Sequence, residues 1–198
     1  MNFDFNKDYI LEDDRVLLRP LKATDDGYLR VFVNNEPELW EYFPVGSNPL
    51  GDNGLERYLQ TAMRMRANNT HYPFIVFDKI KNEYAGSTRF YDIQSAHKIA
   101  SIGNTWYGKA FQGTGLNKHA KFLLLQFSFE EMNLERVGFE ADNTNERSIA
   151  AMKSIGCTVE GVLRSNRTMQ NRRRDTIVLS ILKDEWFSHV KEKLKKKL

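Results

Sequence analysis

The segment Trp106-Tyr-Gly-Lys-Ala-Phe-Gln112-Gly-Thr-Gly115-Leu-Asn117 decides the fold of this chain. It joins strand-forming residues at Ile99–Trp106 to a stretch at about Leu116–Glu131 in which apolar residues recur at helical spacing. Glycine allows positive φ and lets a ligand approach the backbone closely. The first N–H groups of a helix lack partners within it, and the helix dipole favours negative charge there. The turn therefore predicts an anion site, such as one for phosphate.

The same turn has a plain alternative, in which its glycines serve only the geometry of a strand-to-helix connection. The spacing excludes a P-loop, which requires Gly-x-x-x-x-Gly-Lys-Ser/Thr, and it excludes a dinucleotide fingerprint because Lys118 stands where the third glycine belongs. Lys118 and Lys121 follow in the expected helix and add positive charge nearby. From the turn alone, phosphate binding and a plain connection stay equally open.

Upstream of the turn, the sequence predicts two helices and an antiparallel meander. A strand at Arg15–Pro20 ends at proline, which cannot donate to a ladder. A helix follows from Thr24, a capping hydroxyl followed by two acids, to about Asn34. The further elements expected are a loop at Trp40–Pro49, a helix at Leu55–Ala67, and strands at Tyr72–Phe77, Tyr84–Ile93 and Ile99–Trp106.

Downstream of the turn, strands and helices alternate. We expect a strand at Arg136–Ala141, a helix at Asn145–Ile155 ended by Gly156, strands at Cys157–Arg164 and Thr176–Leu182 around a polar hairpin at Asn171, and a basic helix at about 184–198. In that last helix Trp186, Val190, Leu194 and Leu198 recur every fourth residue and predict a docked face. Without a linker or repeat, residues 1–198 are expected to form one α/β (α+β) domain, a mixed sheet flanked by helices.

Composition supports a globular protein and excludes several classes. Of 198 residues 41% are apolar, and the formal net charge is only +3. The basic runs Arg172–Arg174 and Lys195–Lys197 lack interleaved aromatic residues, so we interpret them as solvated surface and rank nucleic-acid binding last. A single cysteine, Cys157, excludes an internal disulfide and a cysteine-based zinc site, and we expect it to pack as a small apolar residue. The histidines, at 71, 97, 119 and 189, lack ligand spacing, so no metal is predicted.

Targeting signals are not evident in the sequence. The segment Met1–Asp8 is polar and lacks the apolar core of a signal peptide. Apolar runs such as Phe122–Leu125 are far shorter than the ~20 residues that span a bilayer. The sequence therefore predicts a cytoplasmic protein that does not associate with membranes.

The turn and the segments after it resemble the GNAT superfamily of N-acetyltransferases. That family's pyrophosphate motif is Gln/Arg-x-x-Gly-x-Gly/Ala between a strand and a helix, and Gln112–Asn117 follows it, with Asn117 in place of the final small residue. Matches to the family's Asn-x-Arg-Ser, Leu-Gly-Phe and Glu-Gly segments follow at Asn145–Ser148, Ile155-Gly156 and Glu160-Gly161, with Asp175 and Glu185-Trp186 beyond them. The combination looks most like the branch of ribosomal-protein N-terminal (alanine/serine) acetyltransferases, over about Val16–Trp186.

The resemblance implies transfer of an acetyl group from acetyl-CoA to a primary amine by direct attack in a ternary complex. It implies a mostly antiparallel sheet splayed into a V, through which the pantetheine arm enters. The acceptor would be a protein N-terminus or a small-molecule amine, and homodimers are common in the family. The implied cofactor-binding residues are Trp106, Gln112, Gly113, Thr114, Gly115, Leu116, Asn117 and Asn145.

The resemblance also implies two catalytic side chains. Ser148 would protonate the CoA thiolate, because Met152 stands in the region where many members carry a tyrosine acid. Glu160 would take the proton of the amine, and a backbone N–H within Asn104–Tyr107 would donate to the carbonyl oxygen. Taken alone, Asn145 reads as a helix cap, Ser148 as a capping or surface hydroxyl, and Glu160 as a solvent-facing glutamate.

Three alternatives stay open at this point. Asn117 and the missing tyrosine also fit an acyl-CoA sensor without turnover. Trp106 and Tyr107 suit either core packing or a wall of the acetyl channel. The loop from Trp40 to Phe43 lies in the region that helps form the family's acceptor site, and Glu36, Glu38 and Glu41 beside it would favour a cationic acceptor unless they are simply solvated.

Overall fold

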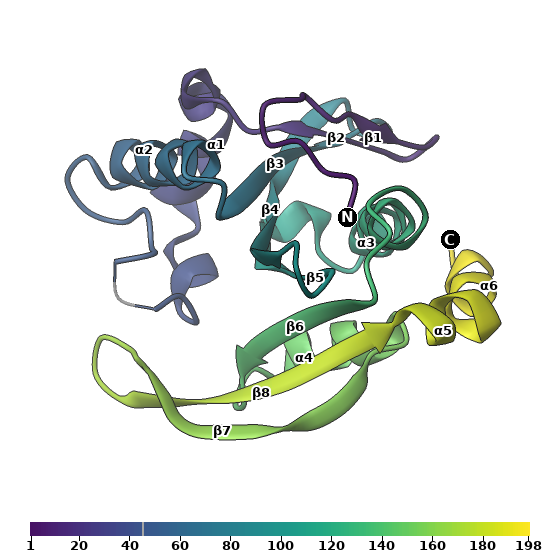
Figure 1. Ribbon diagram of the computed structural model, residues 1–198. Coiled ribbons are helices and arrows are strands. Elements are labelled where there is room, and N and C mark those ends of the chain that lie inside the picture. The colour runs from purple at the N-terminus through teal and green to yellow at the C-terminus, as the bar shows by residue number, and fades with distance from the viewer. Residues whose placement is uncertain (45) are drawn as a thin grey trace.

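The chain folds around one eight-stranded sheet in the order β1-β2-β3-β4-β5-β6-β8-β7, seen in a computed structural model that describes residues 1–44 and 46–198 (Figure 1). Residue 45, within the expected loop Trp40–Pro49, lies outside the described residues. The strands are β1 Leu11–Glu12, β2 Val16–Pro20, β3 His71–Asp78, β4 Glu83–Gln94, β5 Ile99–Tyr107, β6 Arg136–Asp142, β7 Thr158–Thr168 and β8 Arg173–Leu182. Among the strands of the described residues only β5 and β6 pair in parallel, which confirms the mixed, mostly antiparallel sheet.

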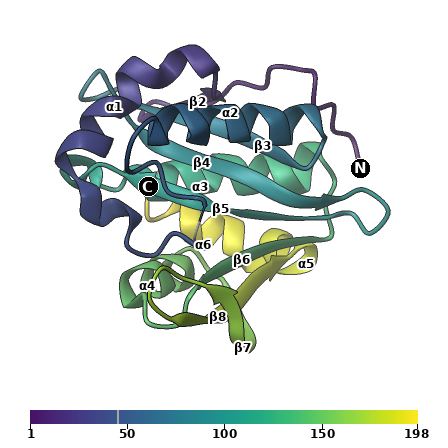
Figure 2. The same cartoon turned by 90° about the vertical axis from the view of Figure 1, so that its left-hand side faces the viewer.

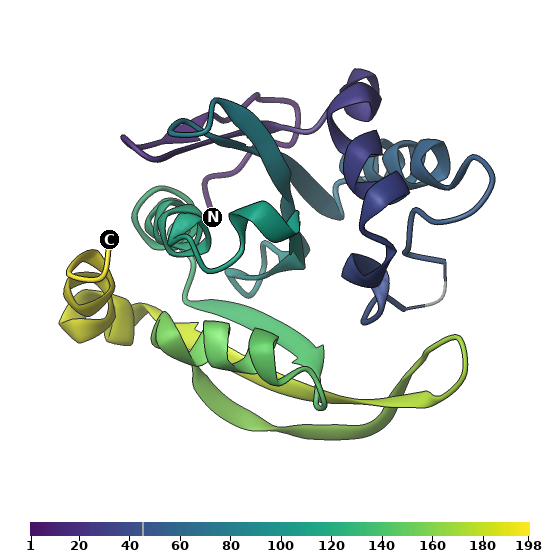
Figure 3. The same ribbon diagram turned by 180° about the vertical axis from the view of Figure 1, so that it is seen from behind.

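Helices cover both faces of this sheet. They are η1 Ala23–Asp25, α1 Asp26–Asn35, η2 Pro37–Trp40, α2 Gly54–Ala67, η3 Lys109–Phe111, α3 Leu116–Gln126, η4 Phe127–Glu131, α4 Glu146–Ser154, α5 Lys183–Glu185, η5 Trp186–Val190 and α6 Lys191–Lys195. In Figure 2, α1 and α2 lie in front of β3 and β4, and α3 lies behind them. Figure 3 shows α4 lying across β6 and β8. The core therefore has two layers, one on each side of the sheet.

The sheet splits between β5 and β6. Their ladder joins only Ile99–Ser101 to Arg136–Gly138. Beyond these residues β5 runs on to Tyr107 and β6 to Asp142, and the two strands diverge (Figure 1). A break in the β4–β5 register and a left-handed residue, Asn104 with φ of 48°, bend β5 at this point. The V that the resemblance implies is therefore present, and its open end faces the glycine turn.

Several details differ from the sequence expectations. Thr24 does not cap α1; the Asp25 carboxylate instead accepts the Lys22 N–H at 2.8 Å and pairs with Arg19 at 2.7 Å.

The two-residue strand β1 was not predicted because two residues carry no periodic signal. Strands β7 and β8 extend further into the hairpin than expected, since polar residues continue a ladder whose outer strand, β7, is exposed along its whole length and shows no burial pattern. Leu198 is 42% exposed because α6 ends at Lys195.

Trp186 docks the C-terminal helices on the core, as the spacing predicts. It is fully buried, stacks on Phe129 at 5.6 Å between ring centroids, and donates from Nε1 to Glu130 at 3.0 Å. Trp186→Ala should lower the free energy of unfolding by about 3–5 kcal/mol in urea titrations, because it leaves a large cavity. The neighbouring Phe187 is 55% exposed, so Phe187→Ala is the matched control with an expected loss below ~1 kcal/mol. Equal losses for the two variants would contradict this docking.

Candidate cofactor and catalytic site

The glycine turn presents unpaired backbone amides to open space. Gly113 and Gly115 have φ of 72° and 90°, and a Cβ added at either residue would meet nothing within 4 Å. Within the described residues, the amides of 113–117 donate to no backbone carbonyl, and the Leu116 N–H reaches only the Thr114 hydroxyl, at 3.5 Å. Thr114 in turn donates to the Phe111 carbonyl at 2.8 Å and fixes the turn. A run of free N–H groups at the start of α3 fits an anion such as pyrophosphate.

The Gln112 side chain braces this turn from both sides. Its Nε2 donates to the Tyr107 carbonyl at 2.8 Å, and its Oε1 accepts from Arg147 at 2.6 Å. Arg147, exposed on the first turn of α4, thereby brings a cation to the turn. The sequence analysis passed over this residue although it lies inside the Asn145–Ser148 motif. Lys121, which we expected beside the turn, is instead 5% exposed and points into the core.

The start of α4 forms the opposite side of the site. The Asn145 Oδ1 accepts the Ser148 N–H at 3.0 Å, so Asn145 caps α4 as its plain interpretation predicts. The half-buried Ser148 hydroxyl makes no hydrogen bond within the described part of the chain. A cleft of about 450 Å³ runs from this cap to the early loop and is lined by Glu38, Glu41, Tyr42, Thr144, Asn145, Glu146 and Arg147. The structure therefore brings the glycine turn, Asn145 and Ser148 to one region.

The Trp106 side chain packs among the core aromatics. It is 4% exposed, its Nε1 donates to the Tyr58 hydroxyl at 3.3 Å, and its ring centroid is 4.7 Å from that of Trp40. Tyr107 is also buried, and burial raises the pKa of its hydroxyl. Core packing thus accounts for both aromatic side chains. At Trp106 only the backbone can contact a cofactor.

Two acids of the early loop are already engaged. Glu36 accepts the Lys109 backbone N–H at 2.7 Å, and Glu38 forms an ion pair with the Lys109 ammonium. These contacts fix η2 against η3. Glu38 and Glu41 both line the cleft, but within the part of the chain that the structure describes only Glu41 has no such contact, so the expected attraction for a cationic acceptor loses most of its basis.

Glu160 lies on β7, separated from the V by β8 and β6. Its carboxylate pairs with Arg136 at 2.7 Å and accepts from the Ser180 hydroxyl. The Arg136 guanidinium, helped by that hydroxyl, lowers the pKa of Glu160. Because Ser180 is registered with Gly138, Glu160 shares a sheet face with the last paired row of β5 and β6. Glu160 therefore lies at the closed end of the V, on the face of the sheet that carries Ser101, Gly138 and Ser180; we call this face the open face.

Glu140 lies closer to the opening and was not among the sequence candidates. It follows Gly138 by two residues on β6, so it faces the same side, beyond the last pair with β5. Its side chain is 26% exposed and pairs with Arg167 at 3.2 Å. Glu140 is the one acid in the predicted strand Arg136–Ala141, and this signal could have identified it.

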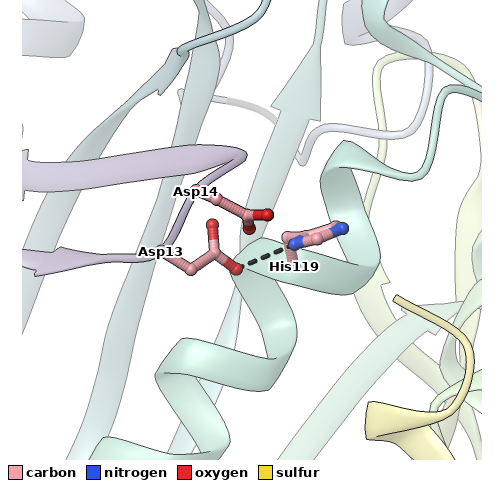
Figure 4. A group of neighbouring side chains, drawn as sticks. All are labelled: Asp13, Asp14 and His119. Atoms are coloured by element: carbon pink, nitrogen blue, oxygen red, sulfur yellow. Dashed lines mark hydrogen bonds and ion pairs between the residues drawn. The ribbon is translucent and has the colours of Figure 1, made fainter.

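Asp13, Asp14 and His119 form a cluster of metal-ligand types (Figure 4). One oxygen of Asp13 accepts the N–H groups of Arg15 and Val16, and the other lies 2.8 Å from the His119 Nδ1. These contacts tie the β1–β2 turn to α3. Spacing rules missed the cluster because its members are far apart in sequence.

Among the residues that the structure describes, no helix has the length and apolar character needed to cross a membrane.

Comparison with known proteins gives a family for this geometry. The profile of the family described as "Acetyltransferase (GNAT) domain" matches residues 15–158. The Bacillus subtilis protein YdaF, which carries the name of a ribosomal N-acetyltransferase, is 27% identical over 177 residues, 88% of this chain and 94% of that protein. The spermidine N(1)-acetyltransferase of Escherichia coli K12 is 24% identical over 178 residues, 89% of this chain and 90% of that enzyme.

Solved structures agree with these relatives. A GCN5-related N-acetyltransferase from Brucella melitensis superposes with a TM-score of 0.86 at 25% identity, over 98% of this chain and 86% of that one. The RimJ protein of Mycobacterium smegmatis, solved in complex with CoA-disulfide, gives a TM-score of 0.78 at 19% identity, over 96% of this chain and 93% of that one. The latter likeness concerns the fold alone.

Proposed function

Because the chain belongs to the GNAT family of acetyltransferases, we propose that it moves the acetyl group of acetyl-CoA directly to a primary amine in a ternary complex. The observation that carries the proposal is the run of unpaired amides at 113–117, at the open end of the V. These amides suit the pyrophosphate of CoA, with Lys118 and Arg147 adding positive charge. The CoA-disulfide bound to the Mycobacterium protein supports the choice of ligand.

The residues of the V supply the remaining chemistry. Beyond Ser101, β5 stays paired with β4 on one edge but has lost β6 on the other. Backbone N–H groups on that open edge are available to the thioester carbonyl as negative charge develops there. The amine nitrogen attacks the carbonyl carbon, the C–N bond forms and the C–S bond breaks. The leaving thiolate needs a proton donor, and the donor that the resemblance implies is Ser148, next to Asn145, the cap of α4. A carboxylate on the open face takes the proton of the amine: Glu160, which the resemblance implies, or Glu140.

The acceptor that this site favours is a protein N-terminus rather than a polyamine. The β7–β8 hairpin borders the open face and carries five arginines and one aspartate between residues 164 and 175. Arg167 and Arg172 form ion pairs with Glu140 and Asp142, and the other three arginines form no ion pair within the described residues. Arg174, which we expected in solvent, is 7% exposed and forms no ion pair within the described residues, and burial lowers its pKa. Such a wall repels a polycation. The name of YdaF points the same way, whereas that of the spermidine enzyme points to the alternative.

A competition between acceptors tests this proposal. With acetyl-CoA and thiol detection, a peptide with a free N-terminal alanine or serine should give a kcat/KM about tenfold or more above that of spermidine, a difference of ~1.4 kcal/mol. The same peptide with a blocked N-terminus is the control and should release no thiol. Faster reaction with spermidine would overturn the acceptor. Acetyl-CoA binding without release for any amine would favour the sensor. A homodimer and a cytoplasmic location stay predictions.

A further inference from the structure

Lys121, in the second turn of α3, is a buried cation that the steps above do not use. Its side chain is 5% exposed, and its Nζ donates to the Thr105 hydroxyl at 2.7 Å and to the Thr88 hydroxyl at 3.2 Å. Within residues 1–44 and 46–198, no carboxylate forms an ion pair with it. An ammonium held between two hydroxyls and away from any counter-ion is unfavourable, and burial lowers the pKa of Lys121 to about 7.

The two threonines link this lysine to the V. Thr88 belongs to β4 and Thr105 to β5, and their hydroxyl oxygens are 2.8 Å apart. Thr105 lies four residues beyond Ser101, on the part of β5 that has lost β6 as a neighbour. Thr88 is fully buried, whereas Thr105 is only half-buried. A continuous chain of donors therefore runs from the Lys121 ammonium to the Thr105 hydroxyl at the edge of the opening.

The other titratable group that the structure couples to Lys121 is Cys157, between α4 and β7. Burial raises the pKa of its thiol to about 12, so it stays uncharged near neutral pH and does not neutralise the lysine. The hydrogen-bond partners of Lys121 within the described residues, Thr88 and Thr105, do not titrate in this range. Lys121 is therefore free to hold or release a proton near neutral pH.

We propose that Lys121, acting through the hydroxyl of Thr105, supplies the proton that the CoA sulfur takes when the thioester breaks. The inference rests on the proposed acetyl transfer and adds a positioning residue to it. As the C–S bond breaks, its electron pair stays on sulfur; the Thr105 proton moves to sulfur and the Lys121 proton moves to Thr105. The free thiol CoA-SH leaves, and neutral Lys121 recovers a proton from solvent.

This route differs from the one through Ser148 in what stands behind the hydroxyl. Ser148 has no hydrogen-bonded donor within the described chain, so its loss of a proton leaves an alkoxide. Thr105 has an ammonium at 2.7 Å that replaces its proton at once. Proton donors are most effective when their pKa lies near the working pH, which suits Lys121 and not an isolated serine.

Three variants test the inference by thiol release from acetyl-CoA. Lys121→Met and Thr105→Val should each lower kcat about 10- to 100-fold and leave the KM for acetyl-CoA within about twofold, because they act on chemistry and not on binding. Thr88→Val is the matched control. It makes the same replacement of a hydroxyl by a methyl group, at a residue that also bonds to Lys121 but lies away from the V. It should lower kcat by no more than about threefold. The alkaline limb of the kcat profile should flatten in Lys121→Met.

Thermal and pH-dependent unfolding checks that the variants are folded. Unfolded lysine keeps its proton to about pH 10.4, whereas folded Lys121 releases it near pH 7. Wild-type stability should therefore rise with pH between these values, and Lys121→Met should lack that rise and melt no lower than wild type at pH 7.

Slow hydrolysis of acetyl-CoA without any amine keeps the inference separate from the proposed function, because water needs the same leaving-group proton but no acceptor. If no amine accelerates thiol release, the proposed transfer fails while the variants are still compared by hydrolysis. Equal losses in Thr88→Val and Thr105→Val, or an unchanged kcat in Lys121→Met, would overturn the role of Lys121.

Discussion

Gly115→Asp should bind CoA about 30- to 1,000-fold more weakly than Gly115→Asn at low salt. The two side chains have the same shape, and both tolerate the φ of 90° better than other residues do. Neither meets another atom at Cβ. They differ by one negative charge at the cap of α3, where we place the pyrophosphate. Two unit charges ~5 Å apart at an effective dielectric of ~20 repel by about 3 kcal/mol, which is roughly a hundredfold in affinity.

Calorimetric titration with CoA measures this difference directly. The gap between the two variants should close as salt is raised, because exposed charges are screened. Both variants carry the same backbone strain at this φ, and an acid at a helix N-terminus is favourable. Gly115→Asp should therefore fold no less stably than Gly115→Asn, and urea titrations of both variants provide that control. Equal affinities for the two variants would place the phosphates elsewhere and remove the main support for the cofactor site.

Sequence periodicity was sufficient for the main elements of the fold. The strand-turn-helix around Gly113 and Gly115, the meander before it and the docked Trp186 all follow from local patterns, because one buried face imposes a period on the residues that form it. The V came from the family resemblance. Nothing in the sequence marks where β5 leaves β6, since that depends on a bend at Asn104 and on pairing between distant segments.

The site was harder to predict wherever a side chain's direction depended on distant partners. Lys121 appeared to be a surface charge near the turn. Its position on the helix instead places it under β4 and β5, where the hydroxyls of Thr88 and Thr105 accept hydrogen bonds from it. For Trp106 the sequence left core packing and a wall of the acetyl channel open, and the structure turns its ring toward Tyr58 in the core. In both cases the chain shows which residue is present, and only the tertiary partners decide which face it occupies.

Glu140→Gln should lower kcat by about 100-fold or more, the usual cost of losing a positioned base, whereas Glu160→Gln should lower it less than about tenfold. Both glutamates face the open side of the sheet, and both changes keep the side-chain shape. Glu140 borders the V beyond the last β5–β6 pair. Glu160 is held two strands away by Arg136 and Ser180, and the lowered pKa makes its carboxylate a weaker proton acceptor.

Comparison of kcat with KM separates a base from a structural residue. Glu140→Gln should lower kcat and keep the KM for acetyl-CoA, because it acts on proton transfer and not on cofactor binding. Glu160→Gln should leave both values much closer to those of wild type. Its half-exposed ion pair with Arg136 is worth no more than ~1 kcal/mol, so its main effect should be a small loss of stability. The reverse pattern, a hundredfold loss confined to Glu160→Gln, would assign the base to Glu160 and show that proximity to the V is not what selects it.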